Sequence, residues 1–483
     1  EMIISSNMSF GVYPGLARGA YQAIKKSGSD EQKALFLPKL ASGEWGGTMN
    51  LTEPQCGTDL GLLRTKAEPQ SNGSYKVTGT KIFISAGEHD LTENIIHLVL
   101  ARLPDAPEGV RGISLFVVPK VLVNEDQSLG ERNSVSCGSI EHKMGLAGSS
   151  TCTMNYDGAT GFLIGEPNKG MRAMFVMMNE ARLGVGVQGL GLSEVAYQNA
   201  ALYAKERTQG RALSGVTRPE KAADPIIVHP DVRRMLLNVR AFNEGARALA
   251  MWTALHIDLS ERHPDETVRK NADDLVGLIM PVLKAFLTDT GFESVNLALQ
   301  CFGGHGYIRD HGMEQFVRDA RITQLYEGTS GIQALDLVGR KLPQGTGRLL
   351  RQFFHPVDQF IQENAGNKEL GDLVVNLAKS FARLQQATAW IAEKGLKDPM
   401  QAGAASSDYL KIFGHVAIGF MWVRMAKVSL SRIADGEGDK AFHENKLKLA
   451  RYYMTKVMPD TSSLLSKVMA GSDPLMAFAE EAF

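Results

Sequence analysis

The sequence has few cysteines, almost no net charge and no long apolar run. Lysine and arginine total 52 against 53 aspartates and glutamates, so the chain lacks the positive field that attracts nucleic acid or an anionic membrane. The longest apolar stretch, residues 416–423, is too short to span a bilayer. No CxxC pair occurs, so no metal site is predicted. We expect reduced, buried thiols in a reducing compartment at Cys56, Cys137, Cys152 and Cys301.

The remaining composition is typical of a globular protein, with 44% apolar and 22% charged residues in a chain of 483. This length predicts about three domains. The chain begins with Glu1, and no basic segment followed by an apolar one indicates a secretory signal. We therefore expect a fragment or a trimmed product.

The first 45 residues have helical patterns. A helix is predicted over residues 17–26, after the breakers Pro14 and Gly15. A second helix begins at a capping box formed by Ser29 and Gln32 and ends at Gly43. Short strands then follow one another, with the hairpin dipeptide Asn-Gly at 72–73, and they predict an antiparallel barrel or sandwich. The predicted strands are 75–78, 82–84, 98–100, 113–115, 151–156 and 162–164.

From about residue 168 the apolar residues recur with the helical period. Residues 232–239 and 275–286 fit two long helices, and the polar loop 214–225 suits a bundle with one exposed connection. Residues 343–347 have the composition of a linker, and a further helical block begins near Leu373. These patterns together predict an α+β fold.

The sequence Gly-Val-Gly-Val-Gln-Gly at 184–189 matches the GxGxxG fingerprint of dinucleotide-binding proteins. That fingerprint requires a preceding strand, whereas residues 171–182 have a helical pattern. A helix packed closely on a neighbour through small residues is the better interpretation.

A first candidate motif is Leu-Thr-Glu-Pro-Gln-Cys-Gly-Thr-Asp at 51–59. Pro54 ends a strand and Gly57 frees the backbone to turn, which makes N–H groups and two threonine hydroxyls available to a polar ligand. An ordinary exit from a strand explains the same pattern equally well.

Two further motifs lie in the helical part. Gly303, Gly304 and Gly306 follow a long apolar helix, and because a helix C-cap needs only one glycine, the excess favours a ligand contact. His305 between them is expected to be a solvated loop residue. In Gln-Leu-Tyr-Glu-Gly-Thr-Ser at 324–330, burial would raise the pKa of Glu327 towards the range of a general base. Spacing alone favours a glutamate stabilised at a helix start.

Together and in this order, Thr-Glu-Pro-x-x-Gly-Thr-Asp, Gln-x-x-Gly-Gly-x-Gly and Tyr-Glu-Gly-Thr resemble the signatures of acyl-CoA dehydrogenases, over about residues 1–342. The tail resembles a longer bacterial branch that includes 3-methylmercaptopropionyl-CoA dehydrogenases. The resemblance implies partial N-terminal helices (1–45), a central antiparallel β-barrel (46–166), a C-terminal four-helix bundle (167–342) and an additional helical domain (343–483).

The resemblance also implies FAD-dependent α,β-dehydrogenation of an acyl-CoA to a 2-enoyl-CoA. The substrate would be 3-methylmercaptopropionyl-CoA or a medium- or long-chain acyl-CoA. Glu327 would take the α-proton while the flavin takes a hydride from Cβ, and the backbone N–H of Glu327 would polarise the thioester carbonyl. FAD would lie between barrel and bundle in a dimer or tetramer. Electrons would pass to an electron-transfer flavoprotein, in the bacterial cytoplasm or, in a eukaryote, the mitochondrial matrix.

The residues that match the family's contact positions fall into two groups. Those expected at the flavin and the rest of FAD are Leu51, Thr52, Gly57, Thr58, Phe83, Ser85, Arg207, Gln209, Gln300, Gly304 and Thr329. Within this group, Arg207 and Gln209 match the pair that reaches the FAD pyrophosphate across the dimer. Those expected at the acyl-CoA are Thr58, Asn179, Arg182 and Gly328.

Some members carry the base on the first bundle helix, where this chain has Ala181. Glu180 is one residue away and rotated by about 100° on a helix, so Glu327 is favoured and Glu180 is second. Individual contacts depart from the common pattern at Met49, Phe83, Asn179 and Gly331.

Thr52 occurs far earlier in this chain than in the family, so most of the N-terminal helical domain is expected to be absent. Two alternatives stay open. An acyl-CoA oxidase could use the same fold, and a non-catalytic relative could bind acyl-CoA or a partner protein. Retention of Glu327 and Arg207 argues against the second.

Overall fold

The computed structural model describes residues 1–483, apart from the side chains of Val176, Asn179 and Glu180. Its contacts divide the chain into two compact units. The barrel unit comprises Met2–Gly184, and the helical unit comprises Val185–Phe483 together with Glu1. The helix α3 (Gly170–Glu206) crosses the boundary between these two parts of the chain.

Two helices open the barrel unit, α1 (Met2–Ser27) and α2 (Asp30–Ser42). The expectation that the first helix starts only after Pro14 was wrong. The helix restarts after a kink at Asn7, whose Oδ1 accepts the Phe10 N–H at 3.0 Å, and it continues through the proline. Burial of residues before the proline gives packing that outweighs the one lost N–H donor. The capping box at the start of α2 and its C-cap at Gly43 are both confirmed.

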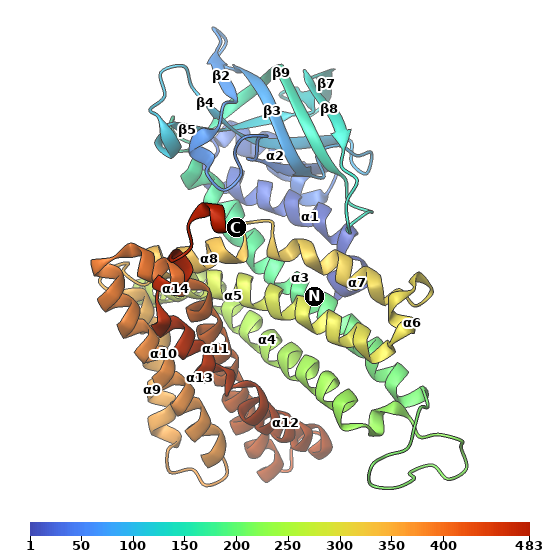
Figure 1. Cartoon of the computed structure of the whole chain (residues 1–483). Coiled ribbons are helices and arrows are strands. Elements are labelled where there is room, and N and C mark those ends of the chain that lie inside the picture. Colours follow the sequence, from blue (N-terminus) through green and yellow to red (C-terminus); the bar gives the residue numbers. More distant parts are fainter. The chain divides into compact units, whose positions relative to one another are not determined.

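The strands of the barrel unit close into a ring, which confirms the predicted barrel (Figure 1). Hydrogen-bonded neighbours follow the order β4-β2-β3-β9-β5, and β5 pairs back with β4. The seven strands of this sheet are β1 (Trp45–Asn50), β2 (Lys66–Pro69), β3 (Tyr75–Ser85), β4 (Asn94–Arg102), β5 (Ile113–Pro119), β8 (Val135–Ile140) and β9 (Thr151–Ile164). A separate ribbon consists of β6 (Val121–Val123) and β7 (Leu129–Arg132).

The expectation of a purely antiparallel barrel was wrong at two pairings. β1 runs parallel to β4, and β2 touches β4 in parallel at a single residue pair. Two other strands separate β1 from β4 along the chain, so the connection is long enough to return in the same direction. The hairpin predicted at 72–73 is present between β2 and β3.

The helical unit is built from long helices, and α11 packs against both α4 and α5. The order continues with α4 (Pro230–Arg262), α5 (Glu266–Phe302), α6 (Gly304–Tyr307), α7 (Met313–Arg321) and α8 (Ser330–Asp336). A turn at the expected linker leads to α9 (Arg348–Asn364), which the sequence patterns missed, and then to α10 (Gly371–Lys397). The last helices are α11 (Pro399–Ala434), α12 (Lys440–Tyr452), α13 (Asp460–Ala470) and α14 (Asp473–Met476).

The glycine-rich segment 184–189 lies inside α3, as predicted, and packs on α5. A Cβ at Gly186 would lie 2.5 Å from the Leu283 side chain, and one at Gly189 would lie 2.6 Å from the Leu287 carbonyl oxygen. On α5, a Cβ at Gly291 would in turn lie 2.7 Å from the Gly189 carbonyl oxygen. The glycines therefore allow two helix backbones to approach closely, and they do not form a dinucleotide site.

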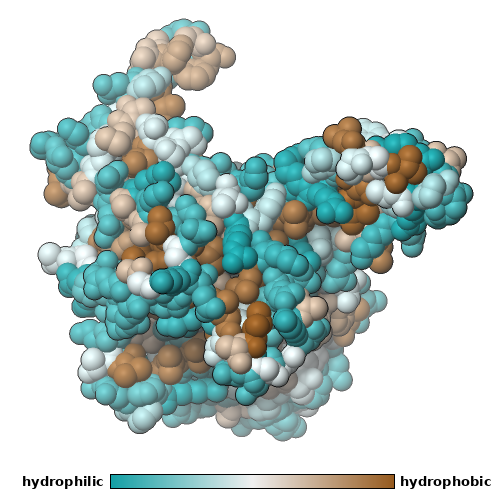
Figure 2. All heavy atoms as spheres, turned by 90° about the horizontal axis from the view of Figure 1, so that it is seen from below, coloured by the Kyte–Doolittle hydropathy of each residue, from teal (hydrophilic) through white to brown (hydrophobic). Residues whose placement is uncertain are grey.

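Within the described part of the chain, one helix, α5, is long and apolar enough to cross a membrane, with a mean hydropathy of 1.5 over its most apolar window. That window is 72% buried inside the protein, so α5 is a core helix of the helical unit. Residues 420–423 of α11 are buried as well, so this apolar run belongs to the core of the helical unit. On the face shown in Figure 2, hydrophobic residues lie in separate clusters among hydrophilic ones.

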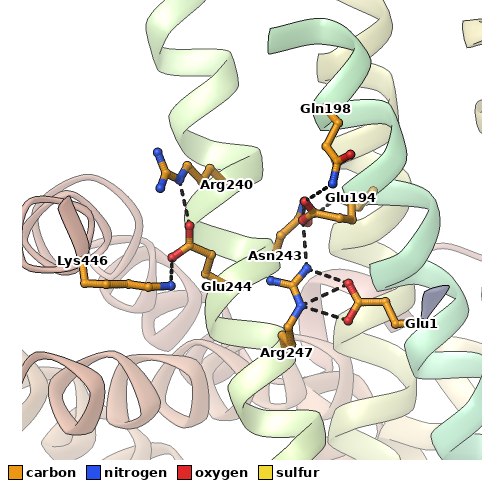
Figure 3. A network of polar contacts seen from close by, with 9 residues as sticks. Glu1, Glu194, Gln198, Arg240, Asn243, Glu244, Arg247 and Lys446 are labelled. Carbon is orange, nitrogen blue, oxygen red and sulfur yellow. Dashed lines mark hydrogen bonds and ion pairs between the residues drawn. The ribbon is translucent and has the colours of Figure 1, made fainter. Parts of the chain in front are cut away.

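A polar network joins α3, α4 and α12 in the helical unit (Figure 3). The Arg247 guanidinium lies 2.6 Å from Glu1 and 3.0 Å from Glu194 of α3. Glu244 of α4 pairs with Lys446, which ties α12 to the bundle.

Candidate active site

The first motif follows β1 and is held by a buried ion pair. Glu53 Oε1 lies 2.8 Å from Lys81 Nζ of β3, and the side chains are 3% and 0% exposed. Lys81 Nζ also donates to the Leu51 carbonyl oxygen at 3.0 Å. Glu53 further accepts the N–H groups of Arg64 and Thr65. The motif's backbone is thereby fixed to β3 from within the barrel unit.

The surroundings of this pair shift both pKa values. Burial alone would raise the pKa of Glu53, but Lys81 and the hydrogen bonds from Thr65 and Arg64 outweigh it and lower the pKa to about 2. Burial lowers the pKa of Lys81 to about 8, an effect that Glu53 partly offsets. Glu53 is therefore ionised at neutral pH and cannot act as a proton donor there.

The structure brings the two barrel segments of the predicted flavin site together. The Ile82 N–H donates to the Thr52 carbonyl oxygen at 2.9 Å, so the 51–58 turn and the 82–85 segment are adjacent. β3 has an irregularity between Lys81 and Ile84, where Phe83 adopts a φ of 59° and is 61% exposed. Among the described residues, none forms a hydrogen bond with Gly57 or Thr58, and both are exposed.

The loop after α3 presents Arg207 and Gln209 in the helical unit. Its organiser is Asp224, a fully buried carboxylate that accepts the N–H groups of Ala212 at 3.0 Å and Arg218 at 2.8 Å. Burial would raise the pKa of Asp224, but these backbone donors outweigh it and lower the pKa. The Gln209 N–H also donates a hydrogen bond to the Asp224 carbonyl oxygen at 3.0 Å. The loop thus keeps a defined shape while Arg207 stays exposed.

The glycine motif after α5 forms a C-cap and a close turn. Gly303 has a φ of 59°, and a Cβ at Gly306 would lie 2.6 Å from the Leu299 carbonyl oxygen. Gln300 and Gly304 are exposed beside this turn. His305 is exposed to solvent, as expected, but it lies in the short helix α6 and not in a loop. Its Nδ1 lies 2.8 Å from the Tyr203 hydroxyl and its ring stacks on His311 with centroids 4.9 Å apart, because the short α6 turns it back onto α3.

The third motif contains a strained backbone. Glu327 adopts a φ of 57° and Gly328 a φ of 88°, two consecutive left-handed residues just before α8. Lys284 Nζ of α5 donates to the Gly328 carbonyl oxygen at 2.7 Å, and Gln333 Nε2 donates to the Glu327 carbonyl oxygen at 3.2 Å. Thr329 is the N-cap of α8 and accepts the Ile332 N–H. Glu327 is one of seven described non-glycine residues with a positive φ, and its sparsely populated conformation is held by the hydrogen bonds that Lys284 and Gln333 donate to this turn.

The remaining predicted residues lie on α3. Arg182 is buried, whereas Asn179 and the alternative base Glu180 lie outside the residues whose side chains are described.

Three family models match successive parts of the chain. These are the middle domain of acyl-CoA dehydrogenases over residues 48–159, their C-terminal domain over 168–342, and a C-terminal domain described as acetyl-CoA dehydrogenase C-terminal like over 353–479. The chain is 45% identical over 477 residues to 3-methylmercaptopropionyl-CoA dehydrogenase of Ruegeria pomeroyi, covering 99% of this chain and 80% of that one. The chain belongs to the acyl-CoA dehydrogenase family.

Two further acyl-CoA dehydrogenases agree with this. The broad-specificity linear acyl-CoA dehydrogenase FadE5 of Mycobacterium tuberculosis is 35% identical over 498 residues, which cover 100% of this chain and 81% of that one. An acyl-CoA dehydrogenase from Bacillus anthracis, solved in complex with FAD, has the same fold with a TM-score of 0.77. It is 21% identical and matches 96% of this chain and 75% of that one. The protein is an FAD-dependent oxidoreductase of this family.

The residues of both units fit FAD as the cofactor of an acyl-CoA dehydrogenase. In the barrel unit, Gly57 and Thr58 offer exposed polar groups that the described residues leave unbonded, and Phe83 offers an exposed ring for a planar group. In the helical unit, no described carboxylate pairs with the exposed Arg207, whose guanidinium suits a pyrophosphate. Among the described residues, no cluster of three His, Cys, Asp or Glu side chains could hold a metal ion.

Sequence reasoning missed the residues that hold the site segments in place. Glu53 in its structural role and Lys81 hold the first motif, Asp224 holds the loop with Arg207, and Lys284, Asp289 and Gln333 hold the third motif. A lysine inside the apolar run 278–287 was a signal for Lys284, and a lysine directly before the apolar residues 82–84 was a weaker signal for Lys81. Neither signal names the partner, because each partner is more than 25 residues away in the chain.

Proposed function

We propose that this acyl-CoA dehydrogenase uses Glu327 as the base that removes the α-proton of an acyl-CoA thioester. The observation that carries the proposal is the left-handed backbone at Glu327, held by donors from α5 and α8. Strain of this kind persists only where the surrounding structure supports it, and it concentrates at catalytic sites. A carboxylate is also the side chain that the chemistry requires for this proton transfer.

In the proposed reaction the Glu327 carboxylate accepts the proton from Cα. The electron pair of the broken Cα–H bond forms the Cα=Cβ double bond as the hydride leaves Cβ. Bound FAD supplies the acceptor for that hydride. The backbone N–H of Glu327 donates to the thioester carbonyl and stabilises the developing negative charge on its oxygen. The product is the 2-enoyl-CoA.

The other site residues bind and orient in this proposal. Thr52, Ser85 and Phe83 contact the flavin, while Arg207 and Gln209 hold the pyrophosphate. Gln300 and Gly304 contact the adenosine half. The remaining residues, Leu51, Gly57, Thr58, Thr329, Arg182, Asn179 and Gly328, complete the contacts to the cofactor or the acyl-CoA.

The substrate we propose is 3-methylmercaptopropionyl-CoA, with medium- and long-chain acyl-CoAs as the competing class. Support comes from the relative at 45% identity, against a broad-specificity relative at 35%. We propose an electron-transfer flavoprotein as the electron acceptor, a homo-oligomer, and a cytoplasmic location in a bacterium. The division into four segments, 1–45, 46–166, 167–342 and 343–483, is part of the same proposal.

The test is anaerobic reduction of the FAD-loaded protein by a panel of thioesters. We expect flavin bleaching with several acyl-CoAs and the fastest bleaching with 3-methylmercaptopropionyl-CoA. Faster bleaching with octanoyl-CoA or palmitoyl-CoA would overturn the substrate. Rapid oxygen consumption under air would identify an oxidase, and bound FAD that no thioester reduces would indicate a non-catalytic relative.

A further inference from the structure

The helix α5 holds the segment that carries Glu327 at three points. Asp289 Oδ1 accepts Gln324 Nε2 at 2.8 Å before Glu327 and Ser330 Oγ at 2.7 Å after it. Between these two contacts, Lys284 Nζ donates to the Gly328 carbonyl oxygen at 2.7 Å. A single helix therefore fixes both flanks and the centre of residues 324–330.

Lys284 is an unusual residue for this place. Its side chain is 0% exposed, in a run of buried residues from Val282 to Leu287. Burying a lysine is costly, so a fully buried one requires a specific partner. Lys284 donates to the carbonyl oxygen of Gly328, the residue directly after the proposed base. The left-handed backbone of Glu327 is unfavourable by itself, so this turn depends on such contacts.

The helix that carries Lys284 is itself held tightly. Gly186 and Gly189 of α3 allow the α5 backbone to approach at Leu283 and Leu287, on either side of Lys284. The Lys284 carbonyl oxygen also accepts the Thr288 hydroxyl at 2.9 Å. Because α5 is held in this way, Lys284 can keep the peptide group of Gly328 in one orientation.

We propose that Lys284, assisted by Asp289, is a positioning residue for catalysis: it holds the turn at 327–328 so that the Glu327 carboxylate is presented to the substrate. This inference rests on the proposed role of Glu327. Gln333 supports the same turn from α8, because its Nε2 lies 3.2 Å from the Glu327 carbonyl oxygen and 3.5 Å from that of Gly328.

The experiment compares Lys284→Met with Lys446→Met in the FAD-loaded protein. Lys446 is a suitable control because it is also a mostly buried lysine of the helical unit, paired with Glu244 on another helix. Two quantities are measured, namely kcat and KM for the best acyl-CoA, and amide hydrogen exchange over residues 322–336. We expect Lys284→Met to lower kcat about tenfold or more with KM within about threefold, and to accelerate exchange in this segment. Lys446→Met should change neither.

A purely structural role would give a different result. The positioning role would be overturned if Lys284→Met lost no more activity than Lys446→Met, or if Lys284→Met left the exchange over residues 322–336 unchanged. If Lys284→Met does not fold, Asp289→Ala takes its place, since it removes the two flanking contacts and should give the same two changes. An unaltered Asp289→Ala enzyme would also contradict the proposal.

The exchange measurement needs no substrate and therefore separates the two proposals. If Glu327→Gln still reduces flavin, the proposed base is wrong, whatever the exchange shows. If Glu327→Gln is inactive and Lys284→Met is normal in both readouts, only the positioning role fails.

Discussion

At the scale of single residues, Glu53 and Lys81 determine the shape of the first motif. The Thr-Glu-Pro sequence suggests contacts to a ligand, yet its glutamate is turned into the barrel unit and bonded to Lys81. Removal of one partner from such a buried pair leaves an uncompensated charge, and this costs more than the pair itself contributes.

We predict that Glu53→Gln lowers the free energy of unfolding by about 3 kcal/mol at neutral pH, because Lys81 loses its counter-charge. Urea denaturation measures this. The control is Glu44→Gln in the same unit, whose carboxylate is 51% exposed in its contact with Lys39. It should change the free energy by less than about 1 kcal/mol. Equal effects of the two changes would contradict the account.

The same carboxylate predicts a pH dependence. The pKa of Glu53 is lowered from 4.5 to about 2 in the folded state, so its stabilisation is fully present above pH 4.5. The stabilisation is lost as the pH falls towards about 2. We therefore expect the stability difference between wild type and Glu53→Gln to shrink over this interval, as measured by denaturation at a series of pH values. A constant difference would show that Glu53 does not titrate as proposed.

At the scale of elements, the site depends on helices and loops that carry the motifs without belonging to them. Asp224 organises the loop with Arg207 and Gln209, and α5 packs on the glycines of α3. Each arrangement gives a prediction.

We predict that Asp224→Ala weakens FAD binding about tenfold, because the loop loses its buried acceptor and Arg207 is no longer pre-organised. Flavin fluorescence titration of the apoprotein measures the dissociation constant. Asp231→Ala is the control, since that carboxylate is 72% exposed and pairs with Arg234 in the next turn of the same helix. If Asp224→Ala binds FAD as tightly as Asp231→Ala, Asp224 does not pre-organise the loop for FAD binding.

We predict that Gly189→Ala destabilises the protein by about 1–3 kcal/mol, because its Cβ would lie 2.6 Å from the Leu287 carbonyl oxygen. Gly184→Ala on the same helix is the matched control. A Cβ there has nothing within 4 Å, so the helix propensity of alanine should stabilise the protein by up to about 1 kcal/mol. Thermal denaturation distinguishes the opposite signs, and a shift of the same sign for both would argue against close packing.

At the scale of the whole molecule, the residues assigned to one reaction divide between two compact units. Of the residues proposed for the site, 51–85 and 179–182 belong to the barrel unit and 207–329 to the helical unit. The sequence was sufficient for the order of helical and strand-rich parts and for the three motifs, because these depend on local periodicity and short spacing. It was also sufficient for the helical interpretation of the segment 184–189.

The remainder depends on contacts between distant parts of the chain. The parallel β1–β4 pair, the continuation of α1 through Pro14 and the missed helix α9 follow from packing that local patterns do not contain. The same holds for the contact of Lys284 with Gly328, two residues 44 positions apart. The sequence could identify Glu327 as a candidate base but not the residues that hold it.

The most direct test of the central claim is anaerobic titration of the FAD-loaded protein and its Glu327→Gln variant with the best acyl-CoA, followed at about 450 nm, where oxidised flavin absorbs. The account predicts bleaching in the wild type and none in Glu327→Gln, with FAD and the thioester still bound to the variant. Bleaching of the variant at the wild-type rate would contradict it and would transfer the search for the base to Glu180.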